Sequence, residues 1–471
     1  MNSWRRWAAL ALVLGLGAAA CSGQSKSGGN GPGATGGTNL ASECGLAAFA
    51  KATKPVNITF WNQNQTQVNT DWLKKTTAAF NASQQDVHVS LLQFPNYQDL
   101  LTKYLGGLSS GDLPDLFQPE DTTVQRLMDS RSTVPMQACV DADHYSLDDF
   151  LPRATAYYSY KGVLQGMPWT VSNIVLWYNR TAFQKAGLDP NHPPATLAEV
   201  MADSRKIVQS GAAKHGIALR VEPYVFEFLN AKSGGTYVNN GNGRDARATA
   251  ATLDTPTARA IWTWWDEMVR SGLAVNTGGA TGNIDHMLAL GQGDAAMTME
   301  ASGVLGTVRK ALESGQYHVK IGVGPLPSLN GGGGVPVGDG SLWIPKAAAP
   351  ARRAAAWQFV KYLSSANEQA DLAASLGYVP VRRSATAVAE LQQTWAHDPI
   401  FKVAYDQLVS GPTDVATVGS LIGDYQGVRD AVKDGMLSML TGGLSPEAAL
   451  EKAQKEADAS IKAYNTRLGV G

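Results

Sequence analysis

The sequence predicts an α/β protein with largely parallel sheets, and two observations favour this fold class. Short runs of β-branched and aromatic residues alternate with longer amphipathic segments along the chain, as expected for strands joined by helices. The roughly 430 residues after position 43 also exceed the usual size of one domain. The sequence therefore predicts two or more α/β domains.

Four apolar runs are the clearest predicted strands, and a helical pattern follows each of them. They are 58–61 (ITFW), 87–92 (VHVSLL), 174–178 (IVLWY) and 295–299 (AAMTM). Segments 196–209 and 256–271 are predicted helices, because their apolar residues recur on one face. The tryptophans at 262, 264 and 265 lie within the second of these helices and are expected to pack in the core rather than to contact a ligand.

The N-terminus has the pattern of an exported chain. Arg5 and Arg6 precede the apolar run 7–17, which is short for a membrane span and typical of a signal peptide, here predicted as 1–21. The segment 18–21 (AAAC) resembles a bacterial lipobox, in which the cysteine receives lipid, including palmitate. Cys21 is therefore the predicted lipidation site. Ala18 stands where the lipobox usually has leucine, so ordinary signal cleavage is the alternative.

Residues 22–43 are predicted to form a flexible tether, since the segment begins with a long stretch rich in glycine and serine. No later segment is apolar for long enough to cross a bilayer. The sequence therefore predicts an extracytoplasmic protein that is anchored to the cell membrane through its lipid alone.

The charge pattern indicates a small ligand rather than a polymer. The chain has 39 basic and 40 acidic residues, and no block rich in lysine and arginine appears. Nucleic acid is therefore not an expected partner, and the membrane surface is not expected to hold the chain by charge. A small polar solute is the expected ligand.

Two cysteines remain after Cys21. Cys44 and Cys139 form an even pair in an oxidising compartment, and a disulfide between them would tie the start of the mature chain to the first domain. Two free buried thiols are the alternative.

The sequence lacks the common signatures of catalysis and of bound cofactors. Its seven histidines are scattered, without a zinc-binding spacing, so no metal is expected. The segment 31–36 (GPGATG) matches a dinucleotide fingerprint, but it lies in the predicted tether, without a strand before it or a helix after it. Nucleophile-elbow and phosphate-loop motifs are also missing. We expect neither a cofactor nor an enzymatic activity.

Several separated blocks resemble the extracellular solute-binding protein family 1, which serves carbohydrate ABC importers. The blocks are 57–61 (NITFW), 97–100 (YQDL), 110–115 (SGDLPD), 166–169 (GMPW), 176–179 (LWYN), 186–190 (AGLDP) and 293–297 (GDAAM). Each block is short, and their order and spacing carry the resemblance, which covers nearly all of the mature chain.

This resemblance implies a two-lobed periplasmic-binding-protein-like fold of type II. The lobes would be joined by hinge crossovers and would close on a ligand in the cleft between them. The implied lobe one takes 44–169 and 295–342, and lobe two takes 170–294 and 343–471. The implied protein partners are the permease subunits of an ABC importer.

Within the family, the chain is most similar to binders of glycerol 3-phosphate and glycerophosphodiesters. The blocks 301–303 (ASG), 340–343 (GSLW) and 376–380 (LGYVP) carry this similarity, together with Ser172 and Arg429. The implied pocket residues are Tyr97, Glu120, Ser172, Ser302, Gly338, Asp339, Tyr378 and Arg429.

The chemistry of these residue types fits such a ligand. Carboxylates and hydroxyls satisfy the hydroxyls of a sugar or a glycerol, and an aromatic face covers its carbons. Arg429 is the expected partner of a phosphate, because its planar guanidinium offers paired donors and stays charged when buried. Asp339 departs from the family, since the relatives carry a small residue there.

The sequence thus predicts the substrate-binding lipoprotein of an ABC importer, with glycerol 3-phosphate or a glycerophosphodiester as the expected solute. A neutral mono- or oligosaccharide is the alternative within the family. Two hypotheses from other classes stay open at this point. An exported glycan-processing enzyme would need two carboxylates facing each other across the cleft, and a peptide-binding adaptor would need a larger apolar groove.

Overall fold

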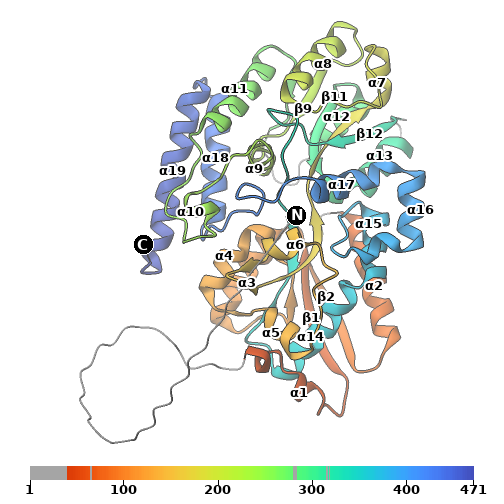
Figure 1. The fold of residues 1–471 in the computed structure, drawn as a ribbon, viewed down its shortest axis with the longest axis vertical. Coiled ribbons are helices and arrows are strands. Elements are labelled where there is room, and N and C mark those ends of the chain that lie inside the picture. The colour runs from red at the N-terminus through yellow and green to blue at the C-terminus, as the bar shows by residue number, and fades with distance from the viewer. Residues whose placement is uncertain (1–39, 64–65, 279–283, 315–316, 318, 471) are drawn as a thin grey trace, which may run out of the picture. The chain divides into compact units, whose positions relative to one another are not determined.

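The computed structural model describes residues 40–63, 66–278, 284–314, 317 and 319–470 (Figure 1). The predicted signal peptide, Cys21 and most of the predicted tether lie outside the described residues. Positions 40–43 of that tether are ordered, because Leu40–Cys44 forms a short 3-10 helix. Among the described residues, no helix combines the length and the apolar character that a membrane span requires.

The first sheet has three parallel strands in the order β2-β1-β3. They are β1 (Val56–Gln63), β2 (Val87–Phe94) and β3 (Leu116–Phe117). The predicted strands 58–61 and 87–92 are confirmed. Helices α2 (Gln67–Ser83) and α3 (Tyr97–Ser110) follow these strands and pack on the sheet. Each begins at a residue whose side chain accepts a backbone N–H, Thr66 for α2 and Asn96 for α3.

The second sheet has five strands in the order β10-β9-β11-β8-β12. They are β8 (Ile174–Asn179), β9 (His215–Leu219), β10 (Ala274–Asn276), β11 (Ala295–Ala301) and β12 (Ile321–Pro325). Strands β9, β10 and β11 run parallel, but β8 is antiparallel to both β11 and β12. The expected largely parallel arrangement is therefore wrong for this sheet, which is mixed. All residues of β8 are buried, so its continuous apolar run resembled that of a parallel strand.

A strand pair connects the two sheets. β7 (Met167–Ser172) is antiparallel to β13 (Gly338–Leu342), and only Asn173 separates β7 from β8. Isolated bridges join Val171 to Val379 and Glu120 to Gly340. Segments that lie far apart in the sequence therefore meet beside β7. The remaining short strands are β4 (Thr133–Val134), β5 (Ser159–Tyr160), β6 (Val163–Leu164) and β14 (Ile344–Pro345).

Helices cover both sheets, and the predicted helices 196–209 and 256–271 are confirmed as α8 and α11. The tryptophans at 262, 264 and 265 are buried in the core. The longer helices of the remainder are α8 (Leu197–Gln209), α9 (Pro223–Lys232), α11 (Pro256–Arg270), α12 (Asp285–Gln292), α13 (Leu305–Ser314), α14 (Pro350–Leu363), α15 (Ala366–Leu376), α16 (Ala389–His397), α17 (Val403–Ser410), α18 (Tyr425–Leu440) and α19 (Pro446–Arg467). The shorter ones are α1 (Leu46–Phe49), α4 (Val124–Ser130), α5 (Gln137–Ala142), α6 (Pro152–Tyr157), α7 (Arg180–Lys185) and α10 (Asn239–Asn242).

The expected lobe boundaries need correction at two places. The segment 295–342, expected in lobe one, supplies β11 and β12 to the five-stranded sheet. The segment 343–471, expected in lobe two, supplies α14, which packs on β1, and α15, which packs on α2. The reason is that β11 returns antiparallel along β8 into the same sheet, so the chain reaches the first sheet again only after β13. Figure 1 shows α14 beside β1 and β2, and β11 beside β9.

The predicted disulfide between Cys44 and Cys139 is confirmed, with a Cα–Cα distance of 4.9 Å. It joins the 3-10 helix at the start of the described chain to α5. Positions 40–43, which the sequence assigned to the tether, therefore belong to the folded part of the chain.

Candidate functional site

The eight residues that the sequence assigned to a pocket lie in one region, beside β7 and β13. Gly338 pairs with Ser172 across these strands, and the carboxylate of Asp339 accepts a hydrogen bond from Ser172. The backbone N–H of Ser302 donates to Asn173 O at 3.0 Å. The structure thus gathers residues from strand ends and helices that the sequence separates by more than three hundred positions.

Local structure explains why these side chains meet. Ser172 ends β7, Ser302 begins the 3-10 helix Ser302–Val304 that follows β11, and Glu120 follows β3. Tyr378 follows Gly377, which ends α15 with a φ of 93° and lets the chain turn back toward β7. Arg429 lies on the first turns of α18. Functional side chains are commonly positioned at such ends of regular elements.

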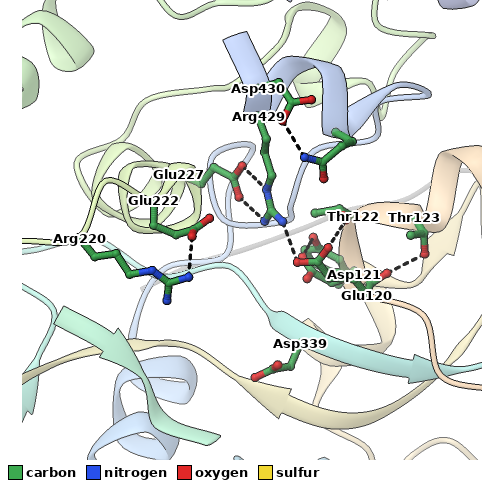
Figure 2. A network of polar contacts seen from close by, with 12 residues as sticks. Glu120, Asp121, Thr122, Thr123, Arg220, Glu222, Glu227, Asp339, Arg429 and Asp430 are labelled. Atoms are coloured by element: carbon green, nitrogen blue, oxygen red, sulfur yellow. Dashed lines mark hydrogen bonds and ion pairs between the residues drawn. The ribbon is translucent and has the colours of Figure 1, made fainter. Parts of the chain in front are cut away.

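The centre of the region is a buried ion cluster around Arg429 (Figure 2). Its Nε and Nη2 atoms donate to the two carboxylate oxygens of Glu227, each at 2.8 Å. Its Nη1 atom donates to Glu120 Oε1 at 2.7 Å. The rings of Tyr224 and Tyr425 lie 5.6 and 5.2 Å from the guanidinium carbon. One cation is thus held by two carboxylates and two aromatic rings.

This arrangement fixes the charge state of Arg429. Burial acts to lower the pKa of its guanidinium, but Glu120 and Glu227 outweigh that effect and hold the pKa well above its ordinary value. All three guanidinium nitrogens donate to carboxylates. Glu227 takes the bidentate position that a phosphate would use, and the expected pairing of Arg429 with a phosphate stays a prediction.

A second carboxylate lies next to this cluster. Asp121 is buried and its Oδ2 atom accepts a hydrogen bond from the hydroxyl of Tyr157 at 2.6 Å. Its Oδ1 atom has no hydrogen-bond partner within the described part of the chain. Burial first, and then the charge of Glu120, raises the pKa of Asp121 well above its usual range. The site therefore holds acceptor atoms that its own donors do not satisfy.

A second arginine is also paired. Arg220 donates to Glu222 at 2.8 Å and lies 3.4 Å from Glu300, which in turn lies 2.8 Å from Nε2 of the buried His286. Burial acts to raise the pKa of Glu300, but His286 and Arg220 outweigh it and keep the pKa low. This network borders the site, because Glu300 lies near the end of β11 and Ser302 begins the 3-10 helix that follows this strand.

Asp339 lies apart from both arginines. It is partly exposed, and burial of its carboxylate raises its pKa to about 7 despite the hydrogen bond from Ser172. Its backbone has a φ of 71°, which is uncommon for a residue with a side chain. Figure 2 shows it on the strand below the ion cluster, away from Arg220 and Arg429.

Two tyrosines supply aromatic surface. The hydroxyl of Tyr97 accepts from Gln118 and that of Tyr378 accepts from Asn69, both at 3.2 Å. Gly303 lets the Tyr378 ring approach, since a Cβ at position 303 would lie 2.5 Å from it. The hydroxyl oxygen of Ser302 is buried and, among the described residues, has no hydrogen-bond partner.

The space within the site is small in this structure. A cavity of about 20 Å³ lies beside Arg429 and is lined by Asp121, Tyr157, Glu227 and Tyr425, among others. A second cavity of about 20 Å³ borders Tyr97 and Glu120. Each has room for about one water molecule. A sugar-sized solute therefore needs the surrounding elements to move apart.

The sequence did not point to several of these residues. Glu227 and Tyr224 come from α9, and Tyr157 comes from α6. Glu227 lies 202 positions from its partner Arg429, so no local spacing connects the two residues. The only available signal was an acidic residue inside an otherwise apolar helical segment, since an acid in that place requires a partner.

The fold and the site define a class of protein: a two-lobed α/β binding protein whose candidate site lies where strands of its two sheets connect. Three solved structures with 20–22% sequence identity share the fold. The GacH receptor of Streptomyces glaucescens, described unliganded and with acarbose, has a TM-score of 0.71 and 22% identity over 87% of this chain and 99% of its own. UgpB from Mycobacterium tuberculosis, in complex with glycerophosphocholine, has a TM-score of 0.73 and 20% identity over 88% and 99%. MalE, a sugar-binding protein from Xanthomonas citri, has a TM-score of 0.72 and 20% identity over 88% and 99%.

The chain belongs to the bacterial extracellular solute-binding protein family, because the sequence model of this family matches residues 75–402. One similar protein is the sn-glycerol-3-phosphate-binding periplasmic protein UgpB of Yersinia pseudotuberculosis, 25% identical over 430 residues, 89% of this chain and 95% of the relative. The protein of the same description from Pectobacterium atrosepticum is 25% identical over 426 residues, 88% of this chain and 93% of the relative. The predicted family and the two-lobed fold are confirmed.

Proposed function

We propose that this protein captures a polyhydroxylated, carbohydrate-class solute and delivers it to the permease subunits of an ABC importer. One observation carries the choice of solute class: Arg429 is already held by Glu120 and Glu227. A site of carboxylates, hydroxyls and tyrosines suits hydroxyl groups, which both donate and accept hydrogen bonds. The solute would bind without reaction, and its preference for the closed arrangement would draw the lobes together.

The charges around the site disfavour an anion. Glu120 and Glu227 pair with Arg429, and Glu222 and Glu300 pair with Arg220. A phosphate at Arg429 would meet the like charges of Glu120 and Glu227, which raise the free energy of the bound state. Hydroxyl donors would instead satisfy acceptors such as Asp121 Oδ1.

Glycerol 3-phosphate or a glycerophosphodiester is the second candidate, and the descriptions of the relatives favour it. Glu120 shows how such a ligand would reach Arg429. Its side chain is 25% exposed, against 8% for Glu227, so it is the partner that a phosphate would displace. The phosphate would then bind the Nη1 side of the guanidinium only.

A thermal-shift screen of the mature protein tests the proposal, because a solute that binds the folded state raises the melting temperature. The panel comprises maltose, maltotriose, glycerol 3-phosphate, glycerophosphocholine and an unrelated peptide. We expect stabilisation by a polyol or sugar and none by the peptide. Stabilisation by glycerol 3-phosphate that exceeds that of every sugar would favour the second candidate. Chemical conversion of a stabilising compound would overturn the binding-protein proposal in favour of an enzyme.

We also propose that Cys21 carries lipid and anchors the protein to the cell membrane, which rests on the lipobox-like segment 18–21 alone. Labelled palmitate should be incorporated into the wild-type chain and not into Cys21→Ala, and the variant should appear in the soluble fraction. Equal membrane association of the two proteins would contradict this.

A further inference from the structure

The backbone conformation of Asp339 differs from that of the surrounding strand β13. Its φ of 71° lies in the left-handed region, between Gly338 and Gly340 on β13. A glycine would adopt this conformation without strain, whereas a residue with a Cβ does so at a cost in conformational energy. Aspartate is among the residues that reach this region most readily, and such outliers cluster at ligand-binding sites.

The groups whose hydrogen bonds or charges act on Asp339 are phenols, hydroxyls and carboxylates from several elements. They are Tyr97 of α3, Glu120 after β3, Tyr158 after α6, Ser172 of β7, Tyr224 of α9, Glu300 of β11 and Tyr378 after α15. In the described part of the chain, no lysine, arginine or histidine forms an ion pair with Asp339; Arg429 is held by Glu120 and Glu227, and Arg220 by Glu222 and Glu300. Asp339 is a carboxylate that the protein desolvates without supplying a cation.

A second observation indicates that a donor is missing. Asp121 is only 4% exposed and lines the 20 Å³ cavity, and its Oδ1 atom has no hydrogen-bond partner among the described residues. Val337 lines the same cavity and precedes Gly338 and Asp339 in the chain. The hydroxyl of Tyr224 lies close to the backbone of Gly338, where an added Cβ would be 2.0 Å from it, and the charges of Asp121 and Asp339 both act on this phenol. An oxygen of Asp121 without a partner and an Asp339 carboxylate without a cation therefore belong to the same site.

We propose that Asp339 is a specificity-determining residue that selects a solute carrying a protonated amine or quaternary ammonium group. This inference rests on the proposed function, because it specifies the solute that the same site takes. The cationic group would lie against the carboxylate of Asp339, next to the phenols of Tyr97 and Tyr378, while hydroxyls of the solute meet the remaining acceptors.

The pH dependence of stability gives a test that needs no ligand. Unfolded aspartate ionises near pH 4, whereas Asp339 ionises at about 7 in the folded protein. The folded state therefore loses stability as pH rises between these values, and the loss is complete above pH 7. Asp339→Asn carries no charge, so it should have a higher melting temperature than the wild type at about pH 8.5 and not at about pH 4. A lower melting temperature for Asp339→Asn at the higher pH would show that the protein satisfies the carboxylate, and would overturn the proposal.

Matched ligand pairs test the selection itself. The pairs are chitobiose and N,N′-diacetylchitobiose, glucosamine and glucose, and glycerophosphocholine and glycerol 3-phosphate, measured by thermal shift against wild type, Asp339→Asn and the exposed control Asp112→Asn. We expect the ammonium-bearing member of at least one pair to stabilise the wild type and Asp112→Asn more than its partner does, and this preference to disappear in Asp339→Asn. Protonation of Asp339 should also weaken the preference below about pH 7.

The outcomes separate this inference from the proposed function. Binding of the members without an ammonium group, with no preference for its presence, would overturn the inference and leave the carbohydrate-class proposal intact. A preference that survives in Asp339→Asn would also overturn it, since another residue would then select the cation. Stabilisation by none of these compounds would count against both.

Discussion

Arg429 determines the chemistry of the site at the scale of single residues. A buried guanidinium is stable only when carboxylates compensate its lost hydration, and here Glu227 takes the bidentate position while Glu120 takes one nitrogen. The ring faces of Tyr224 and Tyr425 add further stabilisation. The same contacts that stabilise Arg429 lower its availability to a ligand anion.

Arg429→Ala should therefore destabilise the fold itself. Removing the cation leaves Glu227 buried without a partner, which costs about 3–5 kcal/mol of unfolding free energy. The control is Arg259→Ala, whose side chain is 41% exposed and pairs with Asp254 and Glu447, and which should lower the stability much less, because solvent screens exposed ion pairs. Urea unfolding of both variants provides the measurement. Equal and small losses would contradict the description of Arg429 as a buried structural cation.

The sequence placed four of the predicted site residues near one another better than it predicted their partners. Ser172, Ser302, Tyr378 and Arg429 were identified by resemblance, and the fold brings them together. The pairing of Arg429 was not predictable, because Glu227 is distant in the sequence and its own helix gives no sign of what it contacts. Chemical roles depend on long-range neighbours, and single-sequence patterns carry little information about them.

At the scale of elements, the pairing of β7 with β13 and the direct passage from β7 to β8 create the site. The strands 58–61, 87–92, 174–178 and 295–299 were predictable from short apolar runs. The direction of β8 and the sheet membership of 295–342 were not, because a run buried on both faces looks alike in parallel and antiparallel pairs. The point at which the chain changes sheets was missed for the same reason.

The disulfide is the element that fixes the start of the folded chain. It closes a loop with a sequence separation of 95 between Cys44 and Cys139. Cys44→Ala together with Cys139→Ala should lower the unfolding free energy by about 2–4 kcal/mol, chiefly because the unfolded chain gains freedom. Denaturant unfolding under non-reducing conditions measures this. Unchanged stability, or two thiols that react with an alkylating agent in the native wild type, would contradict the assignment.

At the scale of the whole molecule, solute capture requires a change of arrangement. The cavities in the site hold about 20 Å³ each, far less than a sugar needs, so the elements around them must separate before a solute can enter. Binding then favours the closed arrangement by the difference in affinity between the two states.

Small-angle scattering should detect this change. We expect the radius of gyration to fall when a saturating solute from the screen is added, because the lobes close around it. The mature chain without residues 1–39 is the suitable sample, since the N-terminal segment would otherwise contribute to the signal. An identical scattering profile with and without solute would argue against hinge closure.

The most direct test of whether a solute binds at this site concerns one buried hydroxyl, that of Ser302. Ser302 and Ser364 are both buried, and the hydroxyl of each has no hydrogen-bond partner among the described residues, but only Ser302 lies at the site. Titration calorimetry with the solute that stabilises the protein most should show about five- to tenfold weaker binding for Ser302→Ala, because the solute supplies the missing partner. Ser364→Ala should bind like the wild type, and neither variant should lose stability. Unchanged affinity in Ser302→Ala would contradict the claim that the solute binds at this site.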